Sequence, residues 1–95
     1  PSSDVKYKNI SSLKLLSEIA NILDEYSYKI INSDSTIILE TPMLKDYINS
    51  MRKSIASHLN ISNEQISIKA TTNDKLGFIG KEEGISVIST TLIQR

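Results

Sequence analysis

The sequence predicts an α/β fold of the α+β type, a two-layer sandwich in which a mixed sheet carries both helices on one face. Two stretches with helical apolar spacing alternate with stretches of strand character along the 95 residues. A strand, a helix and a second strand in succession form a parallel pair with a right-handed crossover. The last strand most simply adds antiparallel to that pair, and the helices then cover one face. The same element order also fits a ferredoxin-like regulatory domain.

The first helix is predicted over residues 11–27, after a polar and irregular opening over residues 1–10. Ser11 or Ser12 is available as its N-cap, because a hydroxyl at that position accepts a backbone hydrogen bond. Apolar side chains recur at the three- and four-residue spacing of one helix face. That stripe consists of Leu13, Leu16, Ile19, Ala20 and Leu23, widened by Leu15 and Ile22.

Strand signals follow the first helix. A short strand is expected over residues 28–32, and a turn over residues 32–35, where asparagine, aspartate and serine cluster. Residues 36–39 are β-branched and continuously apolar, which is typical of a central strand buried on both faces. The sequence therefore predicts two separate strands before the second helix.

The second helix is predicted over residues 44–59, with Thr41 as a capping hydroxyl and Pro42 tolerated in the first turn. The single histidine of the chain, His58, lies at the end of this helix. It is expected to be a surface or capping residue, since a cation favours a helix C-terminus. A strand over residues 66–70 and an extended stretch over residues 85–93 complete the sheet. The apolar side of this helix holds Leu44, Tyr47, Ile48, Met51 and Ile55.

Composition describes one small globular domain. Eleven basic and eleven acidic side chains cancel, so the electrostatic footprint of a nucleic-acid-binding protein is missing. No apolar run approaches the roughly 18 residues that a membrane span needs. The chain has no cysteine, which excludes disulfides and thiolate metal sites. We therefore expect neither nucleic acid nor membrane among its partners.

All three glycines lie in one loop, over residues 77–84, and residues 71–76 separate it from the strand at residues 66–70. The residues between strand and glycines carry hydroxyl, amide, carboxylate and ammonium groups. Such groups at a strand end beside a flexible turn suit a phosphate or metal–phosphate ligand. A glycine-rich hairpin with a polar tip is the alternative that local chemistry leaves open.

The glycine-rich segment resembles the C-terminal signature of the 2-C-methyl-D-erythritol 2,4-cyclodiphosphate synthase family. Weaker matches in the family's order extend the resemblance over nearly the whole chain, including Ser35, Pro42, Met51, Arg52 and Ala56. The specific block is Lys69-Ala70-Thr71-Thr72, then Lys75-Leu76-Gly77-Phe78, Gly80 and Glu83-Gly84-Ile85.

The resemblance implies a lyase of non-mevalonate isoprene biosynthesis that works as a homotrimer. In the family's reaction, the 2-phosphate of a cytidine diphosphate-linked methylerythritol attacks the β-phosphorus of the diphosphate. The bond from that phosphorus to the bridging oxygen breaks, and CMP leaves. The family binds zinc on one subunit and magnesium or manganese on its neighbour, so each active site lies between subunits.

The resemblance also implies site residues. Thr72 matches the threonine that stabilises the transition state, and Asp74 stands where the family has a glutamate ligand of the second metal. The other expected substrate-binding residues form four groups. These are the cytosine pocket, with Leu39, Glu40, Thr41, Pro42, Met43, Leu44, Lys45, Ala70 and Thr71; the loop tip, with Asn73; the substrate loop, with Ser2, Ser3 and Asp4; and the three-fold axis, with Phe78 and Lys81.

Several positions depart from the family pattern. Met43 replaces an ammonium, Ser2 replaces a carboxylate, Asp74 is one methylene shorter than glutamate, and Ile88 replaces a glutamate. The alternatives are therefore a degenerate homologue, or a non-catalytic trimeric α/β module that binds a small ligand. The family's zinc ligands have no counterpart in the sequence, so we expect residues 1–95 to be a single C-terminal domain of a longer polypeptide. We also expect that this segment alone is not a stable monomer.

The amino-acid usage indicates an AT-rich coding sequence, because sixteen isoleucines and seven asparagines stand against three alanines and two arginines. Together with the resemblance, this skew points to one of two locations. They are the plastid, or apicoplast, of a protozoan parasite and the cytoplasm of a bacterium.

Overall fold

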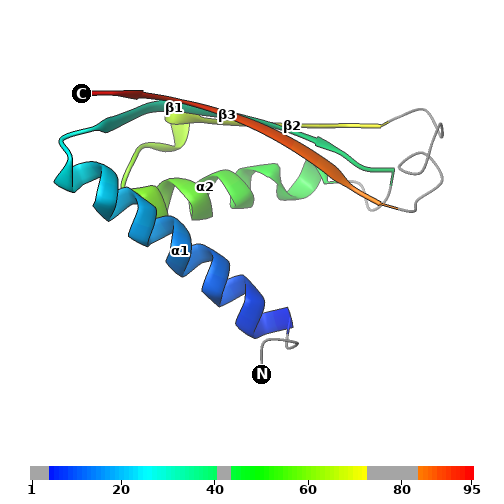
Figure 1. Ribbon diagram of the computed structural model, residues 1–95. Helices are drawn as coiled ribbons and strands as arrows, with labels where there is room; N and C mark the ends of the chain where they lie inside the picture. Colours follow the sequence, from blue (N-terminus) through cyan, green and yellow to red (C-terminus); the bar gives the residue numbers. More distant parts are fainter. Residues whose placement is uncertain (1–4, 41–43, 73–83) are drawn as a thin grey trace.

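The computed structural model describes residues 5–40, 44–72 and 84–95 of the chain. Figure 1 shows one sheet with both helices on the same side of it; the second helix runs along the sheet, and the first slants away toward its N-terminal end. The two-layer prediction is confirmed. In chain order the elements are α1 (Val5–Glu25), β1 (Lys29–Ile38), a 3-10 turn (Lys45–Tyr47), α2 (Ile48–Leu59), a 3-10 turn (Asn63–Gln65), β2 (Ile66–Thr71) and β3 (Ser86–Gln94).

The described sheet has the order β2-β1-β3, so β1 is its central strand. β1 runs parallel to β2, with Ser33 opposite Ile66 and Ile38 opposite Thr71. β3 is antiparallel to β1, with Ile38 opposite Ser86. Because α2 connects the parallel pair, the carboxyl ends of β1 and β2 meet at the end of the sheet where α2 begins.

The predicted start of the first helix and the predicted turn after it were wrong. Residues 5–10 are helical rather than irregular, because extending an existing helix adds a hydrogen bond for each residue at little extra cost. The turn expected over residues 32–35 does not form, and β1 passes through it without a break. Cross-strand hydroxyl pairs hold this segment extended: Ser33 with Thr91 at 3.0 Å and Ser35 with Ser89 at 2.7 Å. Pairing with β3 thus overrides the local turn preference.

The expectation that residues 36–39 are buried on both faces was also wrong. Only Ile37 is buried, at 6% exposure, and its three companions are half-buried. The second helix begins later than predicted, since residues 45–47 form a 3-10 turn before α2. Its end at Leu59 and the strands near residues 66–70 and 85–93 are confirmed.

Both helices end in the same backbone motif, with a non-glycine residue in the left-handed region. Ser27 has φ 63° and Asn60 has φ 58°. After α1, the amide of Tyr28 donates to the carbonyl of Leu23 at 2.8 Å. After α2, the amide of Ile61 donates to Ala56 at 3.0 Å. These are Schellman ends, which satisfy the last free carbonyls of a helix.

The core lies between the C-terminal halves of the helices and the start of β2. Ala56, Leu59 and Ile66 are buried there, and the half-buried residues packed against them are Leu16, Ala20, Ile30, Ile55, Ile61 and Ile68. Ile19, which the sequence placed on the inner stripe, is 43% exposed. It belongs to a second, outward apolar stripe of α1 with Leu15 and Ile22, and Tyr26, just beyond the end of α1, is exposed as well. None of the helices described here is long and apolar enough to cross a membrane.

Candidate functional site

A pocket of about 250 Å³ lies where β1 and β2 end and α2 begins. We call it the strand-end pocket. Ligands of open α/β sheets characteristically bind outside the carboxyl ends of parallel strands. The residues that line this pocket are Leu39, Leu44, Lys45, Ile48, Ala70, Thr71 and Thr72.

Main-chain hydrogen bonds hold the walls of the strand-end pocket. The amide of Leu39 donates to the carbonyl of Thr71 at 3.0 Å, which continues the parallel ladder beyond the end of β1. On the helical side, the amide of Tyr47 donates to the carbonyl of Leu44 at 2.9 Å and closes the 3-10 turn. The pocket is therefore built on regular backbone on both sides, which keeps its shape well defined.

The lining side chains divide into an apolar floor and a polar rim. Leu39, Leu44 and Ile48 are half-buried and form the floor. Lys45, Thr71 and Thr72 are exposed and carry the ammonium and hydroxyl groups. This arrangement suits a ligand with one flat apolar part and one anionic part, because the floor excludes water and the rim can donate hydrogen bonds.

The structure brings together six of the residues that the resemblance implied. Residues from two segments about thirty positions apart meet in this pocket: Leu39, Leu44 and Lys45 with Ala70, Thr71 and Thr72. Glu40, which follows Leu39 in the sequence, is half-buried and does not line the pocket. The other ten implied residues lie outside the described residues: Ser2, Ser3, Asp4, Thr41, Pro42, Met43, Asn73, Asp74, Phe78 and Lys81.

Ile48 lines the pocket and was missed as a site residue. The sequence placed it on the apolar side of the second helix, which predicts a core contact. A signal was available in its spacing, since it follows Leu44 by four positions and opens the helix beside the strand ends. Side chains on a helix lean toward its N-terminus, so the first residue of α2 leans toward the pocket.

Arg52 anchors the start of β2 to α2. Its Nε donates to the carbonyl of Ile66 at 2.8 Å, and its Nη2 donates to the carbonyl of Asn63, also at 2.8 Å. Both bonds are partly buried, and a guanidinium fork can reach two carbonyls at once. Since β2 ends at the pocket and α2 begins there, this anchor helps to set the distance between its two walls.

The described residues contain no group of three or more histidine, cysteine, aspartate or glutamate side chains that could hold a metal ion. His58 is half-buried, and its Nδ1 lies 2.7 Å from the carbonyl of Ser54, one helical turn earlier. Because a carbonyl only accepts, Nδ1 carries the proton. His58 therefore bonds within its own helix to a carbonyl that precedes the last turn, so the prediction of a surface or capping residue was wrong.

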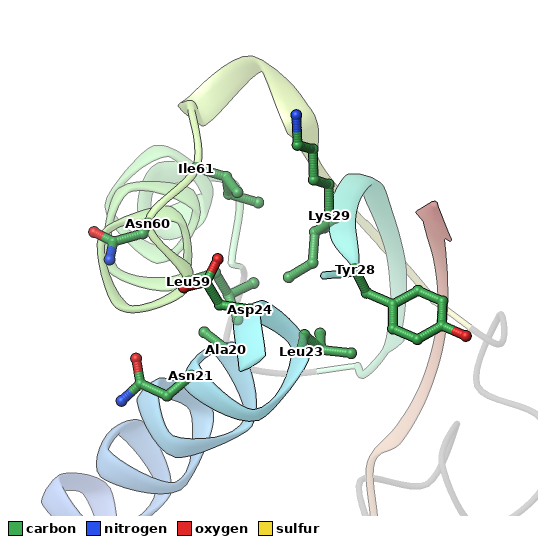
Figure 2. Close-up of a pocket in the computed structure, with 10 residues that line it drawn as sticks. Ala20, Asn21, Leu23, Asp24, Tyr28, Lys29, Leu59, Asn60 and Ile61 are labelled. Atoms are coloured by element: carbon green, nitrogen blue, oxygen red, sulfur yellow. The ribbon is translucent and has the colours of Figure 1, made fainter. Parts of the chain in front are cut away.

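A second hollow of about 330 Å³ lies at the opposite end of α2 (Figure 2). Leu23, Leu59 and Ile61 contribute apolar surface to it, while Asp24 and Lys29 are exposed at its edge. Figure 2 shows that the ring of Tyr28 points away from this hollow, toward β3. Among the described residues that the resemblance implied, none lines this hollow.

The fold is that of cyclodiphosphate synthases. The 2C-methyl-D-erythritol 2,4-cyclodiphosphate synthase of Plasmodium vivax superimposes with a TM-score of 0.86 at 31% identity, over 88% of this chain and 56% of that one. The bifunctional IspDF of Campylobacter jejuni gives a TM-score of 0.83 at 38% identity, over 98% of this chain and 25% of that one.

The family follows from the sequence comparison. A model described as the YgbB family matches residues 1–94, so the chain belongs to the YgbB family. Two curated relatives are named 2-C-methyl-D-erythritol 2,4-cyclodiphosphate synthase. The one from Clostridium tetani is 52% identical over 95 residues, which is 100% of this chain and 60% of the relative. The one from Clostridium kluyveri is 53% identical over 93 residues, which is 98% of this chain and 57% of the relative.

The resemblance inferred from the glycine-rich segment is thereby confirmed. The chain spans 57% to 60% of the length of these two relatives.

Proposed function

We propose that the protein to which this chain belongs is a 2-C-methyl-D-erythritol 2,4-cyclodiphosphate synthase. It converts 4-diphosphocytidyl-2-C-methyl-D-erythritol 2-phosphate to the 2,4-cyclodiphosphate and releases CMP, a lyase step of non-mevalonate isoprenoid biosynthesis. The observation that carries the proposal is the strand-end pocket. It joins Leu39, Leu44 and Lys45 to Ala70, Thr71 and Thr72, six residues for which the family resemblance implies contact with substrate.

Each part of the pocket has a role in the proposal. The cytosine ring packs on the apolar floor of Leu39, Leu44 and Ile48, and the main chain around Leu39 reads its edge. The hydroxyl of Thr72 donates to a phosphoryl oxygen whose charge grows in the transition state. A related structure described as a CDP complex of IspF from Plasmodium falciparum, with a TM-score of 0.81 at 29% identity, supports a cytidine diphosphate ligand.

We also propose that the enzyme needs metal ions, and this part of the proposal rests on the family resemblance. Asp74 is the proposed ligand of magnesium or manganese, and the zinc ligands are proposed to lie outside this segment. The described residues around the pocket contribute hydroxyl, ammonium and main-chain groups rather than a metal-binding cluster. Their own part in the reaction is to bind the nucleotide and to donate hydrogen bonds to the phosphates.

We extend the proposal to a homotrimer, because the described chain exposes more apolar surface than a free domain of this size favours. On β3, Val87 is 56%, Ile88 61% and Leu92 55% exposed, and β3 lies at one side of the described sheet. Sedimentation of the full protein should give a trimer, and Ile88→Asp should dissociate it. Ser57→Asp, an exposed change on α2, should leave the trimer intact. A monomeric wild-type protein would contradict this part.

A bacterial cytoplasm is the proposed location, in preference to an apicoplast. The clostridial relatives are 52% and 53% identical to this chain, whereas the two Plasmodium structures are 31% and 29% identical.

The test is CMP release from the cytidine-linked substrate by the full-length protein loaded with zinc and magnesium. Wild-type protein should release CMP, and Thr72→Ala should lower kcat by about a hundredfold, as loss of one transition-state donor does. Ser57→Ala, which removes an exposed hydroxyl on α2 away from the pocket, is the matched control and should keep the wild-type rate. A wild-type protein that releases no CMP would leave a degenerate homologue, if it still binds CDP, or a non-catalytic ligand-binding module.

A further inference from the structure

Ile48 occupies a distinctive place in the strand-end pocket, because it is the first residue of α2 and lies on the apolar floor. Its backbone is already helical, with φ −59° and ψ −43°. A helical side chain leans toward the turn before it. Ile48 therefore leans toward the 3-10 turn that forms this wall of the pocket, rather than toward the core cluster around Ala56.

The position of Ile48 is stiff. An isoleucine in a helix holds essentially one χ1 rotamer, because both Cβ branches meet the preceding turn. One turn further along, Arg52 fixes α2 to the start of β2 through its bonds to Ile66 and Asn63. Across the pocket, Leu39 is held by its hydrogen bond to Thr71. Neither wall can easily withdraw to admit a larger ligand.

The side chains of the apolar floor can select a ligand only by its size. Leu39, Leu44 and Ile48 offer no polar side-chain atom to the ligand, so they cannot read donors and acceptors. The pocket measures about 250 Å³, below the roughly 300–1,000 Å³ of pockets that enclose a whole drug-sized molecule. Because these three side chains close the bottom of the pocket, they limit how large a base ring can enter, while the phosphates of the nucleotide stay outside on the polar rim.

We propose that Ile48 sets the size limit of the strand-end pocket and so favours a single-ring pyrimidine base over a two-ring purine. The inference rests on the proposed function and adds to it a residue that determines base selectivity. Leu44 is a poorer candidate for this role, because its side chain is not β-branched and it lies outside the regular helix.

The test compares Ile48→Ala with Ile55→Ala in the full-length protein. Ile55 lies seven positions along α2, is half-buried and packs against the core cluster without lining the pocket. Calorimetry should measure the Kd of CDP and of ADP for each variant, and thermal unfolding should report the stability of each. Wild-type protein should prefer CDP. Ile48→Ala should reduce the ratio of the two affinities by about tenfold or more, the usual effect of altering an apolar pocket.

Ile55→Ala should lower the thermal stability and keep the wild-type affinity ratio. Ile48→Val, which shortens the side chain while keeping it β-branched, should give an intermediate ratio. Wild-type protein that prefers CDP, together with an unchanged ratio in both Ile48 variants, would overturn this inference alone. Wild-type protein that binds neither nucleotide would overturn the proposed function as well.

Discussion

Gln65, the last residue before β2, and Ile31 of the neighbouring strand β1 are joined by a hydrogen bond, in which the Gln65 Nε2 donates to the Ile31 carbonyl at 3.0 Å. The same nitrogen lies 3.0 Å from the carbonyl of Ile30, and the Oε1 of Gln65 accepts from the amide of Ser62 at 2.9 Å. The pairing of β1 with β3 shifts register between Ile30 and Asn32. The amide side chain of Gln65 thus bonds the two carbonyls at the register shift in β1, and it also caps the 3-10 turn before β2.

The hydrogen bonds of Gln65 predict that Gln65→Glu, a substitution of nearly the same shape, strongly lowers the stability of the fold. Gln65→Glu keeps the acceptor for Ser62 but replaces the donor with a carboxylate oxygen that faces two carbonyls. We expect the free energy of unfolding to fall by about 1–3 kcal/mol, the cost of leaving partly buried polar groups unsatisfied. Urea denaturation measures it. Gln94→Glu makes the same change at an exposed position near the end of β3 and is the control, and equal effects of the two changes would contradict the assigned role.

Arg52 should not be replaceable by lysine. A lysine ammonium cannot span the carbonyls of Ile66 and Asn63 as the guanidinium fork does. We expect Arg52→Lys to lower the free energy of unfolding by about 1–3 kcal/mol, as loss of charge-assisted hydrogen bonds does. The exposed neighbour serves as the control, since Lys53→Met removes a cation without touching these bonds. If Arg52→Lys unfolds like wild-type protein, the fork does not contribute to stability.

The left-handed ends of the helices predict a stabilising change. Ser27 has φ 63°, a conformation that costs an L-residue other than glycine roughly 1 kcal/mol. Ser27→Gly should therefore raise the free energy of unfolding by about 0.5–1 kcal/mol. Asn60→Gly should gain less, because asparagine tolerates this region better. Ser17→Gly, within α1, should instead destabilise the protein by about 0.5 kcal/mol, and a gain at that position would refute the conformational explanation.

Glu64 predicts a local dependence on pH. The hydrogen bond from the Ser62 hydroxyl is the main cause that lowers the pKa of Glu64 below its ordinary 4.5, and a backbone hydrogen bond and the charge of Arg52 add to it. A lowered pKa in the folded state means that the ionised form contributes stability. That contribution is fully present above the ordinary pKa and is lost as the pH falls through the folded value.

Ser62→Ala should raise the pKa of Glu64 toward 4.5. Carboxyl NMR signals followed between neutral and acidic pH would show it, and the destabilisation caused by the variant should shrink as the pH falls below that value. A Glu64 titration that is the same in Ser62→Ala and wild-type protein would refute the role of the hydroxyl.

Local patterns predicted most of the fold. The apolar periodicity of α2, the alternation in β2 and the long final strand depend on neighbours in the sequence, and the structure contains each of them. The parallel pairing of β1 with β2 also followed, because a helix between two strands leaves few other arrangements. The six residues of the strand-end pocket were named because the segment resembles a known family, since their types alone left a polar hairpin possible.

Tertiary contacts decided what the sequence by itself could not. Residues 32–35 have the composition of a turn, yet Thr91 and Ser89, far along the chain, hold them extended. Ile48 has the spacing of a core residue, yet the meeting of two strand ends with α2 makes it part of a pocket. The amino-acid sequence determined the family and the periodic elements, which arise from local interactions. The strand pairing through residues 32–35 and the floor of the pocket arise from contacts between distant segments, so only the folded chain shows them.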